Sequence, residues 1–251
     1  MTHGTFAWAD LSALTLERAK GFYGPLFGWS YQQVTQLDGS PYWLASTDRG
    51  PAAGLFDMPE MFRKLKLPSY WMPYFWVMSA DKACEQGRRL GGKVEMGPLG
   101  DPKTGRIALI RDPLGAGFTA VEGPPEMFGA GAPGIGQPVW CALHVSDASA
   151  VRGFYETLFG WRFRAAPWSA GAYRTETAER REVVDLVELS DADRGRYQFW
   201  GLHFRVQNAQ QSQRLATSLG GSLVHADQVD GDPLLLMQDP DGAAFFLRGH
   251  D

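Results

Sequence analysis

One carboxylate stands out in an otherwise apolar stretch near the N-terminus. Residues 6–11 alternate as a β-strand does, and Asp10 falls on the same side as Phe6 and Trp8. Burial raises the pKa of a carboxylate that has no partner, so Asp10 could act as a general base or as a hydrogen-bond anchor. A structural aspartate, bonded to the backbone or to an indole N–H, is the alternative.

Two histidines lie in similar strand-like stretches of the C-terminal half. His144 follows Trp140, and His203 comes two residues before Arg205. Two imidazoles near a guanidinium could bind an anion or shuttle a proton. They could also form a displaced metal site, although the sequence supplies no obvious carboxylate for it. Separate histidines that are hydrogen-bonded or half exposed are the alternative.

An internal repeat shows which elements must position these residues. The phrase F-Y-x-x-L-F-G-W occurs at 22–29 and again at 154–161, an offset of 132 residues (154 − 22). Each copy is typical of the end of an amphipathic helix, with Gly28 or Gly160 as a left-handed stop. Asp147 is placed to cap the start of the second helix.

Each copy continues with the same order of elements. Strands at 71–77 and 200–206 lead into helices that end in Leu-Gly-Gly, and the last strands, 118–122 and 244–248, follow Asp-Pro-x-Gly turns. Residues 57–68 interrupt the pattern. We interpret them as a covering loop or a mobile lid, in which Met58, Met61, Phe62 and Leu65 form a short amphipathic turn.

The repeat predicts an α+β fold of two tandem modules. We place the modules at 1–123 and 138–251, joined at 124–137 by a linker rich in Gly and Pro. In each strand the small and aliphatic side chains should pack on the following helix, and the remaining side chains should face the space that the sheet encloses.

Strand alternation therefore predicts which side chains line each enclosed space. In the first module the set is Trp8, Asp10, Met72, Tyr74 and Trp76. In the second module the set is Trp140, His144, His203 and Arg205. Indole and phenol rings favour a flat ligand, because stacked aromatic pairs gain roughly 0.5–1.5 kcal/mol beyond the burial of area. Tryptophans that merely fill the sheet interior are the alternative.

Composition narrows the classes of partner and compartment. The net charge of −4 gives no basic footprint for nucleic acid, and no apolar run is long enough to cross a membrane. We see no signal peptide at the N-terminus. Cys84 and Cys141 are isolated, which is typical of free thiols in a reducing compartment, so we expect a cytoplasmic protein. We also expect a monomer or a homodimer.

Taken together, the repeated helix phrase, the Leu-Gly-Gly ends and the Asp-Pro-x-Gly turns resemble the vicinal oxygen chelate superfamily. This superfamily contains glyoxalase I, extradiol dioxygenases and the bleomycin and fosfomycin resistance proteins. The resemblance covers nearly the whole chain. Phrases such as Trp8-Ala-Asp-Leu11 and Trp71-Met-Pro-Tyr-Phe75 are similar to those of a two-module bacterial subgroup labelled glyoxalase or hydroxylase. The resemblance implies paired βαβββ units whose sheets curl into a cup.

The resemblance also implies a divalent metal in each cup, held mostly by His or Glu, with open positions for two adjacent substrate oxygens. None of the matching positions here carries His, Asp or Glu. They are Trp8, Met72 and Thr119 in the first module, and Trp140, Gly201 and Phe246 in the second. We therefore expect no metal at the usual centre and no cofactor.

The leading functional expectation is a protein that binds a planar or aromatic small molecule, by sequestration as in the resistance proteins. One alternative is a metal-free lyase, isomerase or hydroxylase-like enzyme that uses Asp10 or His144 and His203. Further alternatives are a metal-dependent glyoxalase or dioxygenase, and an interaction protein whose cups are filled by side chains.

Overall fold

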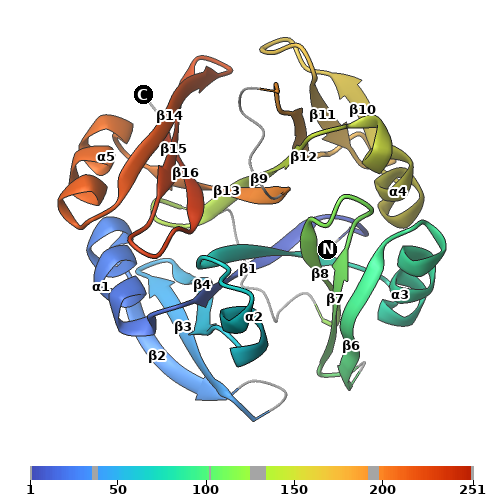
Figure 1. Ribbon diagram of the computed structural model, residues 1–251, viewed down its shortest axis with the longest axis horizontal. Coiled ribbons are helices and arrows are strands. Elements are labelled where there is room, and N and C mark those ends of the chain that lie inside the picture. Colours follow the sequence, from blue (N-terminus) through green and yellow to red (C-terminus); the bar gives the residue numbers. More distant parts are fainter. Residues whose placement is uncertain (1, 36–38, 102, 125–133, 192–197, 250–251) are drawn as a thin grey trace. The chain divides into compact units, whose positions relative to one another are not determined.

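The computed structural model describes residues 2–35, 39–101, 103–124, 134–191 and 198–249 (Figure 1). It contains two mixed sheets of eight strands, one from each predicted module. The two sheets have the same strand order when the strands are counted from the first strand of each module. The orders are β2-β3-β4-β1-β5-β8-β7-β6 and β10-β11-β12-β9-β13-β16-β15-β14. The predicted α+β fold of two tandem modules is confirmed.

The elements of the first module are β1 (Phe6–Ala13), α1 (Leu16–Phe27), β2 (Ser30–Thr35), β3 (Pro41–Thr47), β4 (Gly50–Asp57), α2 (Glu60–Lys64), β5 (Tyr70–Trp76), α3 (Ala80–Arg89), β6 (Lys93–Asp101), β7 (Gly105–Arg111) and β8 (Gly117–Glu122). Those of the second are β9 (Pro138–Val145), α4 (Ser149–Phe159), β10 (Arg162–Ala165), β11 (Ala172–Glu176), β12 (Glu182–Glu188), β13 (Phe199–Val206), α5 (Ala209–Ser218), β14 (Ser222–Val229), β15 (Asp232–Gln238) and β16 (Ala244–Gly249). Most of the predicted linker, 125–133, lies outside the described residues, and the exact module boundaries stay a prediction.

The ends of the repeated helices follow local chemistry. Asp147 Oδ1 accepts the N–H groups of Ser149 at 2.8 Å and Ala150 at 3.3 Å, which satisfies donors that the first turn of α4 leaves open. Gly28 and Gly160 end α1 and α4 with φ angles of +69° and +70°, the left-handed region that Gly enters at no steric cost. The predicted glycine stops are confirmed, and Asp147 accepts the first N–H groups as predicted, although the residue at the N-cap position is Ala148.

The segment that interrupts the strand pattern forms the short helix α2. Met58 and Phe62 are buried, whereas Met61 and Leu65 are 61% and 62% exposed, so only two of the four apolar residues of the predicted amphipathic turn are covered. Arg63 donates to the Met58 carbonyl oxygen at 2.8 Å, which ties the helix to the chain that precedes it. This contact favours the interpretation of a covering element.

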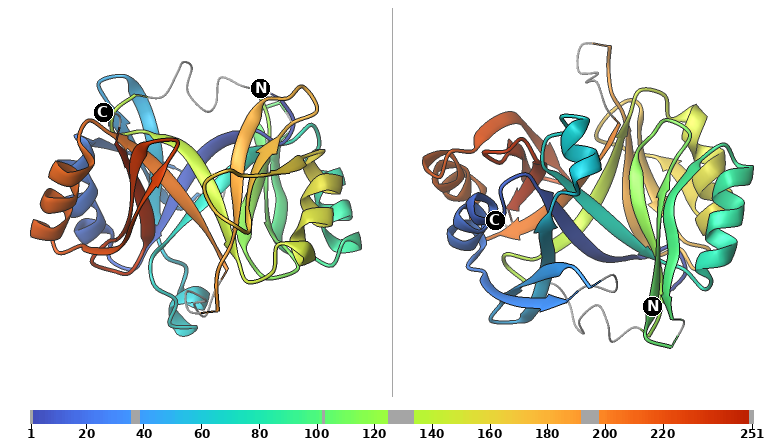
Figure 2. Two further views of the ribbon diagram at one scale, coloured as in Figure 1. Left: turned by 90° about the horizontal axis from the view of Figure 1, so that it is seen from above. Right: turned by 60° about the horizontal axis from the view of Figure 1, so that its bottom comes forward.

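The chain divides into two compact units that do not coincide with the modules. Unit 1 contains α3, α4, β6–β8 and β10–β12, and unit 2 contains α1, α2, α5, β2–β4 and β14–β16. Strands β1, β5, β9 and β13 pass from one unit to the other along their length. In each unit two helices lie side by side, α3 with α4 and α1 with α5 (Figure 2). We call the sheet face that is turned away from these helices the inner face.

In unit 1 the repeated phrase of the second module bonds to elements of the first. The Tyr155 hydroxyl donates to Asp112 Oδ2 at 3.0 Å, and Trp161 Nε1 donates to the Gly4 carbonyl oxygen at 2.9 Å. A Cβ on Gly4 would lie 2.8 Å from Trp161 Nε1, so only Gly fits there.

Unit 2 repeats the arrangement with the modules exchanged. Tyr23 donates to Asp239 Oδ2 at 3.0 Å, and Trp29 Nε1 donates to the Gly136 carbonyl oxygen at 2.7 Å. Both aspartates begin Asp-Pro-x-Gly turns, with the Gly N–H bonded to the Asp carbonyl oxygen at 2.9 Å and 3.0 Å. In each compact unit, the repeated phrase of one module therefore forms buried hydrogen bonds to residues of the other module.

No helix in the described part of the chain has the length and apolar composition to cross a membrane.

Candidate functional site

Asp10 lies on the inner face of β1, within unit 2. It is 3% exposed and stands beside Gly54 of β4 in the parallel register. The hydroxyl of Tyr42, from β3, donates to Asp10 Oδ1 at 2.5 Å, the short distance typical of a hydrogen bond to a carboxylate. Asp10 is thus half of a carboxylate–phenol pair, and the sequence did not reveal Tyr42.

Gly54 makes room for this pair. A Cβ at position 54 would lie 1.6 Å from Tyr42 Oη and 2.3 Å from Asp10 Oδ1, so any other residue would displace the phenol. The Tyr42 side chain reaches Asp10 across the bare backbone of β4. A Gly inside an apolar strand often marks such a close approach, and it was the available sequence signal.

The second module carries its carboxylate on a different strand. Ala142 of β9 corresponds to Asp10 through the offset of 132 residues (142 − 10), and it stands beside Asp185 of β12. Asp185 Oδ2 accepts the Trp140 indole N–H at 2.8 Å, and Oδ1 accepts Arg174 Nε at 2.8 Å. Each module therefore has one buried carboxylate at this place, opposite a Gly or an Ala that leaves space for it.

Arg174 joins aromatic and acidic groups on the inner face in unit 1. Its guanidinium carbon lies 4.4 Å from the Trp168 ring centroid and 5.6 Å from that of Trp140, within the range of cation–π attraction. Its Nη1 also donates to Glu182 at 2.8 Å. The buried carboxylate of Asp185 is tolerated because it is paired and hydrogen-bonded. The sequence did not indicate Arg174, Trp168 or Asp185 as site residues.

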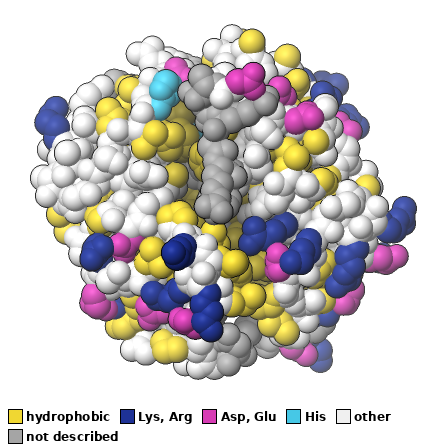
Figure 3. Space-filling view, in the orientation of Figure 1, with side chains coloured by type: hydrophobic (Ala, Val, Ile, Leu, Met, Phe, Trp, Pro, Cys, Tyr) yellow, Lys and Arg dark blue, Asp and Glu magenta, His cyan; other side chains and the backbone are white. Residues whose placement is uncertain are grey.

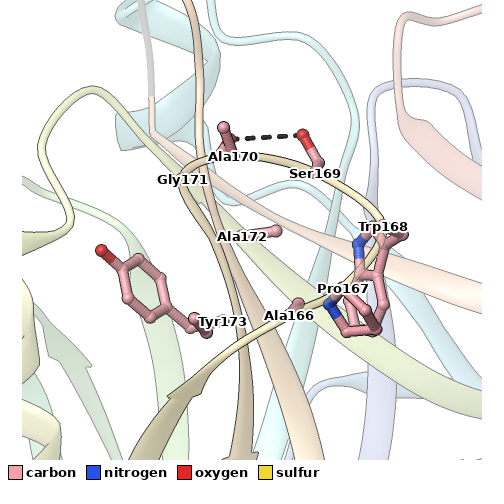
Figure 4. A pocket seen from close by; sticks show the side chains of 9 residues that line it. Ala166, Pro167, Trp168, Ser169, Ala170, Gly171, Ala172 and Tyr173 are labelled. Atoms are coloured by element: carbon pink, nitrogen blue, oxygen red, sulfur yellow. Dashed lines mark hydrogen bonds between the residues drawn. The ribbon is translucent and has the colours of Figure 1, made fainter.

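A hollow of about 350 Å³ lies at the β10–β11 hairpin and is lined by residues 165–173. Trp168 and Tyr173 point to opposite sides of it (Figure 4). None of the side chains predicted from the sequence lines this hollow, and its wall consists mainly of small residues. We therefore regard it as a feature of the hairpin, and not as the predicted cup.

The two histidines have different surroundings. His144, in unit 1, stacks on Phe199 with ring centroids 4.7 Å apart and planes at 5°, and its Nδ1 lies 3.2 Å from the Ala142 carbonyl oxygen. Burial lowers the pKa of His144 from 6.5 to about 4, so the imidazole is neutral near pH 7. His203 belongs to unit 2, where its ring centroid lies 4.7 Å from that of Phe246. The facing pair of histidines stays a prediction.

The other predicted ligand-binding residues lie on the expected strands. Tyr74 stands beside Thr119 in the β5–β8 register, and Trp76 donates its indole N–H to the Gly123 carbonyl oxygen at 2.9 Å. Arg205 stands beside Arg248 in the β13–β16 register. Trp8 lies in β1 within unit 1, and Met72 lies in β5 within unit 2. That Trp8, Met72, Tyr74 and Trp76 line the first cup and Arg205 the second stays a prediction.

The positions that the resemblance implies for metal ligands carry no His, Asp or Glu side chain. Trp140 uses its indole N–H on Asp185, and an indole is a donor only. Thr119 and Phe246, on the last strands, stand beside Tyr74 and His203. Within the described ranges, no group of three or more His, Cys, Asp or Glu side chains is arranged to hold a metal ion.

Comparisons with known proteins agree with this architecture. Residues 140–248 match the family model described as a glyoxalase-like domain. The anthracycline biosynthesis protein DauV of Streptomyces sp. strain C5 is 30% identical, with 96% of this chain and 92% of DauV covered. The Mn(II)-bound glyoxalase of Novosphingobium aromaticivorans has the same fold, with a TM-score of 0.65 at 12% identity over 99% of this chain and 82% of that protein.

The dioxygenase LapB of Pseudomonas sp. KL28 also shares the fold, with a TM-score of 0.64 at 12% identity over 100% of this chain and 93% of LapB. At this identity the structural neighbours establish the fold and no more. The relationship to DauV along almost the full length of both chains establishes common descent. The chain therefore belongs to the glyoxalase-like family of the vicinal oxygen chelate superfamily.

Proposed function

We propose that this glyoxalase-like protein binds a planar aromatic small molecule on the inner faces of its sheets, without a metal at the usual centre. The observation that carries the proposal is Trp140, an indole at a metal-donor position whose orientation is fixed by the hydrogen bond to Asp185. A side chain that is already held in place loses little conformational entropy when a ring stacks on it. Trp8, Tyr74 and Trp76 would add to the lining in unit 1, and Met72 and Arg205 would line the inner face in unit 2.

The relative DauV supports the class of ligand. Its name assigns it to anthracycline biosynthesis, and anthracyclines are planar, fused-ring aromatic compounds. Large flat ligands gain binding energy from stacking on Trp and Tyr and need few polar groups for orientation. The proposal excludes nucleic acid as a partner, because the net charge is −4 and acidic and basic side chains are both present on the face shown in Figure 3.

A metal-free enzyme is the second candidate, and the short contact between Asp10 and Tyr42 favours it. A carboxylate bonded to a phenol can accept a proton from a substrate that lies against it. His144 is the weaker candidate for a base, because burial lowers its pKa to about 4. Loss of turnover in Asp10→Asn with intact ligand binding would establish this activity.

The first test is a titration of intrinsic tryptophan fluorescence with anthraquinone sulfonate, a soluble planar probe. We expect saturable quenching by the wild-type protein and binding about tenfold weaker in Trp140→Ala, roughly the 1.4 kcal/mol that one stacked pair can supply. Trp43→Phe is the matched control, because Trp43 lies on the helix side of β3 under Lys20. Equal affinity in the wild type, Trp140→Ala and Trp8→Ala would contradict the inner faces as the site.

A further inference from the structure

The outer edge of the second sheet is exposed along almost its whole length. β14 is the last strand in the order of this sheet, and its residues from Ser222 to Gln228 are all exposed (Figure 1). Within the described residues, β15 is the only strand that pairs with β14. The backbone N–H and C=O groups on the outer side of β14 are therefore a template for one more strand.

The other sheet edges are less suited to an added strand. β6, the counterpart of β14 in the first module, contains Pro98 and has two irregularities in its register. β2 and β10 have only six and four residues. β14 has eight residues without Pro or Gly and one irregularity, between Leu223 and His225. Bulges, Pro and short strands are the usual obstacles to edge pairing, so β14 is the least hindered of these four edges.

The backbone of β14 points its polar groups outwards at Gln228 and Ala226. Gln228 stands beside Pro233 of β15, which has no N–H, so these two residues cannot exchange a pair of hydrogen bonds. The Gln228 N–H bonds to Asp227 Oδ1 at 2.7 Å, which brings this carboxylate to the outer edge. Polar groups of successive strand residues point to alternate sides, so the N–H and C=O of Ala226 also face the outer edge.

A second copy of β14 can pair with this edge in only a few registers. Two identical antiparallel strands of one sheet are related by a two-fold axis perpendicular to the sheet, which keeps each side chain on its own face. Residues that stand opposite each other share a face, so one residue must stand opposite its own copy. In the regular, exposed part of β14 this central residue is one of residues 225–228.

The register centred on Ala226 brings complementary groups together. It places His225 of each copy opposite Asp227 of the other, twice by symmetry, and an imidazole has an N–H to donate in either protonation state. Ala226 would exchange two backbone hydrogen bonds with its copy. A centre at Asp227 would set two carboxylates against each other, and a centre at Gln228 would use an N–H that Asp227 already accepts.

We propose that the chain forms a homodimer through β14, which pairs antiparallel with β14 of a second copy about a two-fold axis at Ala226. Leu223 and Val224, which are 43% and 54% exposed, come directly before the paired segment and would be covered in part by the added strand. Because only one short strand of each copy takes part, the dimer is weak and reversible. The inference does not depend on the ligand of the proposed function.

Disulfide trapping tests the register. Ala226→Cys should form a covalent dimer in oxidised glutathione, because its two Cα atoms would be about 5.5 Å apart, a distance that a disulfide spans. Gln228→Cys is the matched control, since its two copies would lie roughly 13 Å apart on the same exposed strand. It should cross-link at least about tenfold more slowly. The native thiols of Cys84 and Cys141 are buried. Equal rates for the two variants overturn the proposed register.

Charge exchange tests the pairing in solution. In sedimentation velocity, the wild type should associate increasingly with concentration. His225→Asp sets carboxylates opposite each other in both symmetric pairs and should weaken association by about tenfold or more. The double variant His225→Asp/Asp227→His has the net charge of the wild type and should recover most of the association. A wild type that stays monomeric at all concentrations, or an association that neither variant changes, overturns the inference.

Discussion

Tyr155 and Asp112, which are 43 residues apart in sequence and come from different modules, share a buried hydrogen bond of 3.0 Å. Tyr23 and Asp239 repeat this bond in the other compact unit. Burial and the nearby Asp112 carboxylate raise the pKa of Tyr155 well above its ordinary value, so the phenol stays protonated and remains a donor. Each unit thus depends on motifs from both modules, which explains why the two motifs are repeated together.

The bond between Tyr155 and Asp112 predicts a stability effect. Tyr155→Phe leaves a buried carboxylate without its phenol donor, and the unfolding free energy should fall by about 1–3 kcal/mol. Chemical denaturation checks this value. Tyr173→Phe is the control, because Tyr173 is half-buried under Arg152 and its loss should change stability by less than about 0.5 kcal/mol. Equal effects of the two substitutions would contradict the role of the bond.

Gly136 predicts a second stability effect. A Cβ there would lie 2.4 Å from the Phe27 carbonyl oxygen, and φ is +75°. Gly28 has a φ of +69° and open space around it, so a substitution there measures backbone strain without steric overlap. Gly28→Ala should cost about 1 kcal/mol of unfolding free energy through strain alone. Gly136→Ala should cost clearly more in the same thermal melts, and equal costs would show that the close contact is unimportant.

The ion pair between Arg174 and Asp185 predicts a third stability effect. Arg174→Gln leaves Asp185 buried without its cation, which should cost about 3–5 kcal/mol of unfolding free energy. Arg164→Gln is the control, because the Arg164 side chain is 59% exposed and its pairs with Glu176 and Glu182 should contribute less than about 1 kcal/mol. A loss in Arg174→Gln as small as that of the control would mean that Asp185 is not held as described.

His144 predicts a pH dependence of stability. Its pKa is about 4 in the folded chain and 6.5 when unfolded, so between these values the unfolded state binds a proton that the folded state does not. Stability from this residue is complete above pH 6.5 and falls as the pH drops towards 4, by up to about 3 kcal/mol. His144→Phe should remove this part of the acid sensitivity, as measured by denaturation at both ends of the window. An unchanged slope in the variant would contradict the burial of a neutral imidazole.

The sequence was sufficient for the architecture because the signals for it are local. The spacing of apolar residues and the position of Gly160 predict the end of α4, and Asp147 predicts its start. Strand alternation predicts, by the same local rule, that Asp10 and His144 each lie on the side of the strand opposite the small and aliphatic residues. Such patterns span only a few residues, and no tertiary contact is needed to read them.

The contacts of the site could not be predicted in the same way. Tyr42 reaches Asp10 from another strand, across Gly54, and no residue spacing along the chain predicts this contact. Asp185 does not correspond to Asp10 in the repeat, so an alignment of the two copies gives Ala142 and conceals the second carboxylate. Partners that are set by strand register become visible only when the sheet is assembled.

Isothermal titration calorimetry with anthraquinone sulfonate, before and after dialysis against EDTA, tests the central claim most directly. We predict saturable binding with the same affinity in both samples, since Trp140 and Thr119 occupy positions where a metal ligand would be needed. The absence of saturable binding, or binding that disappears after dialysis and returns with a divalent metal, would contradict the account.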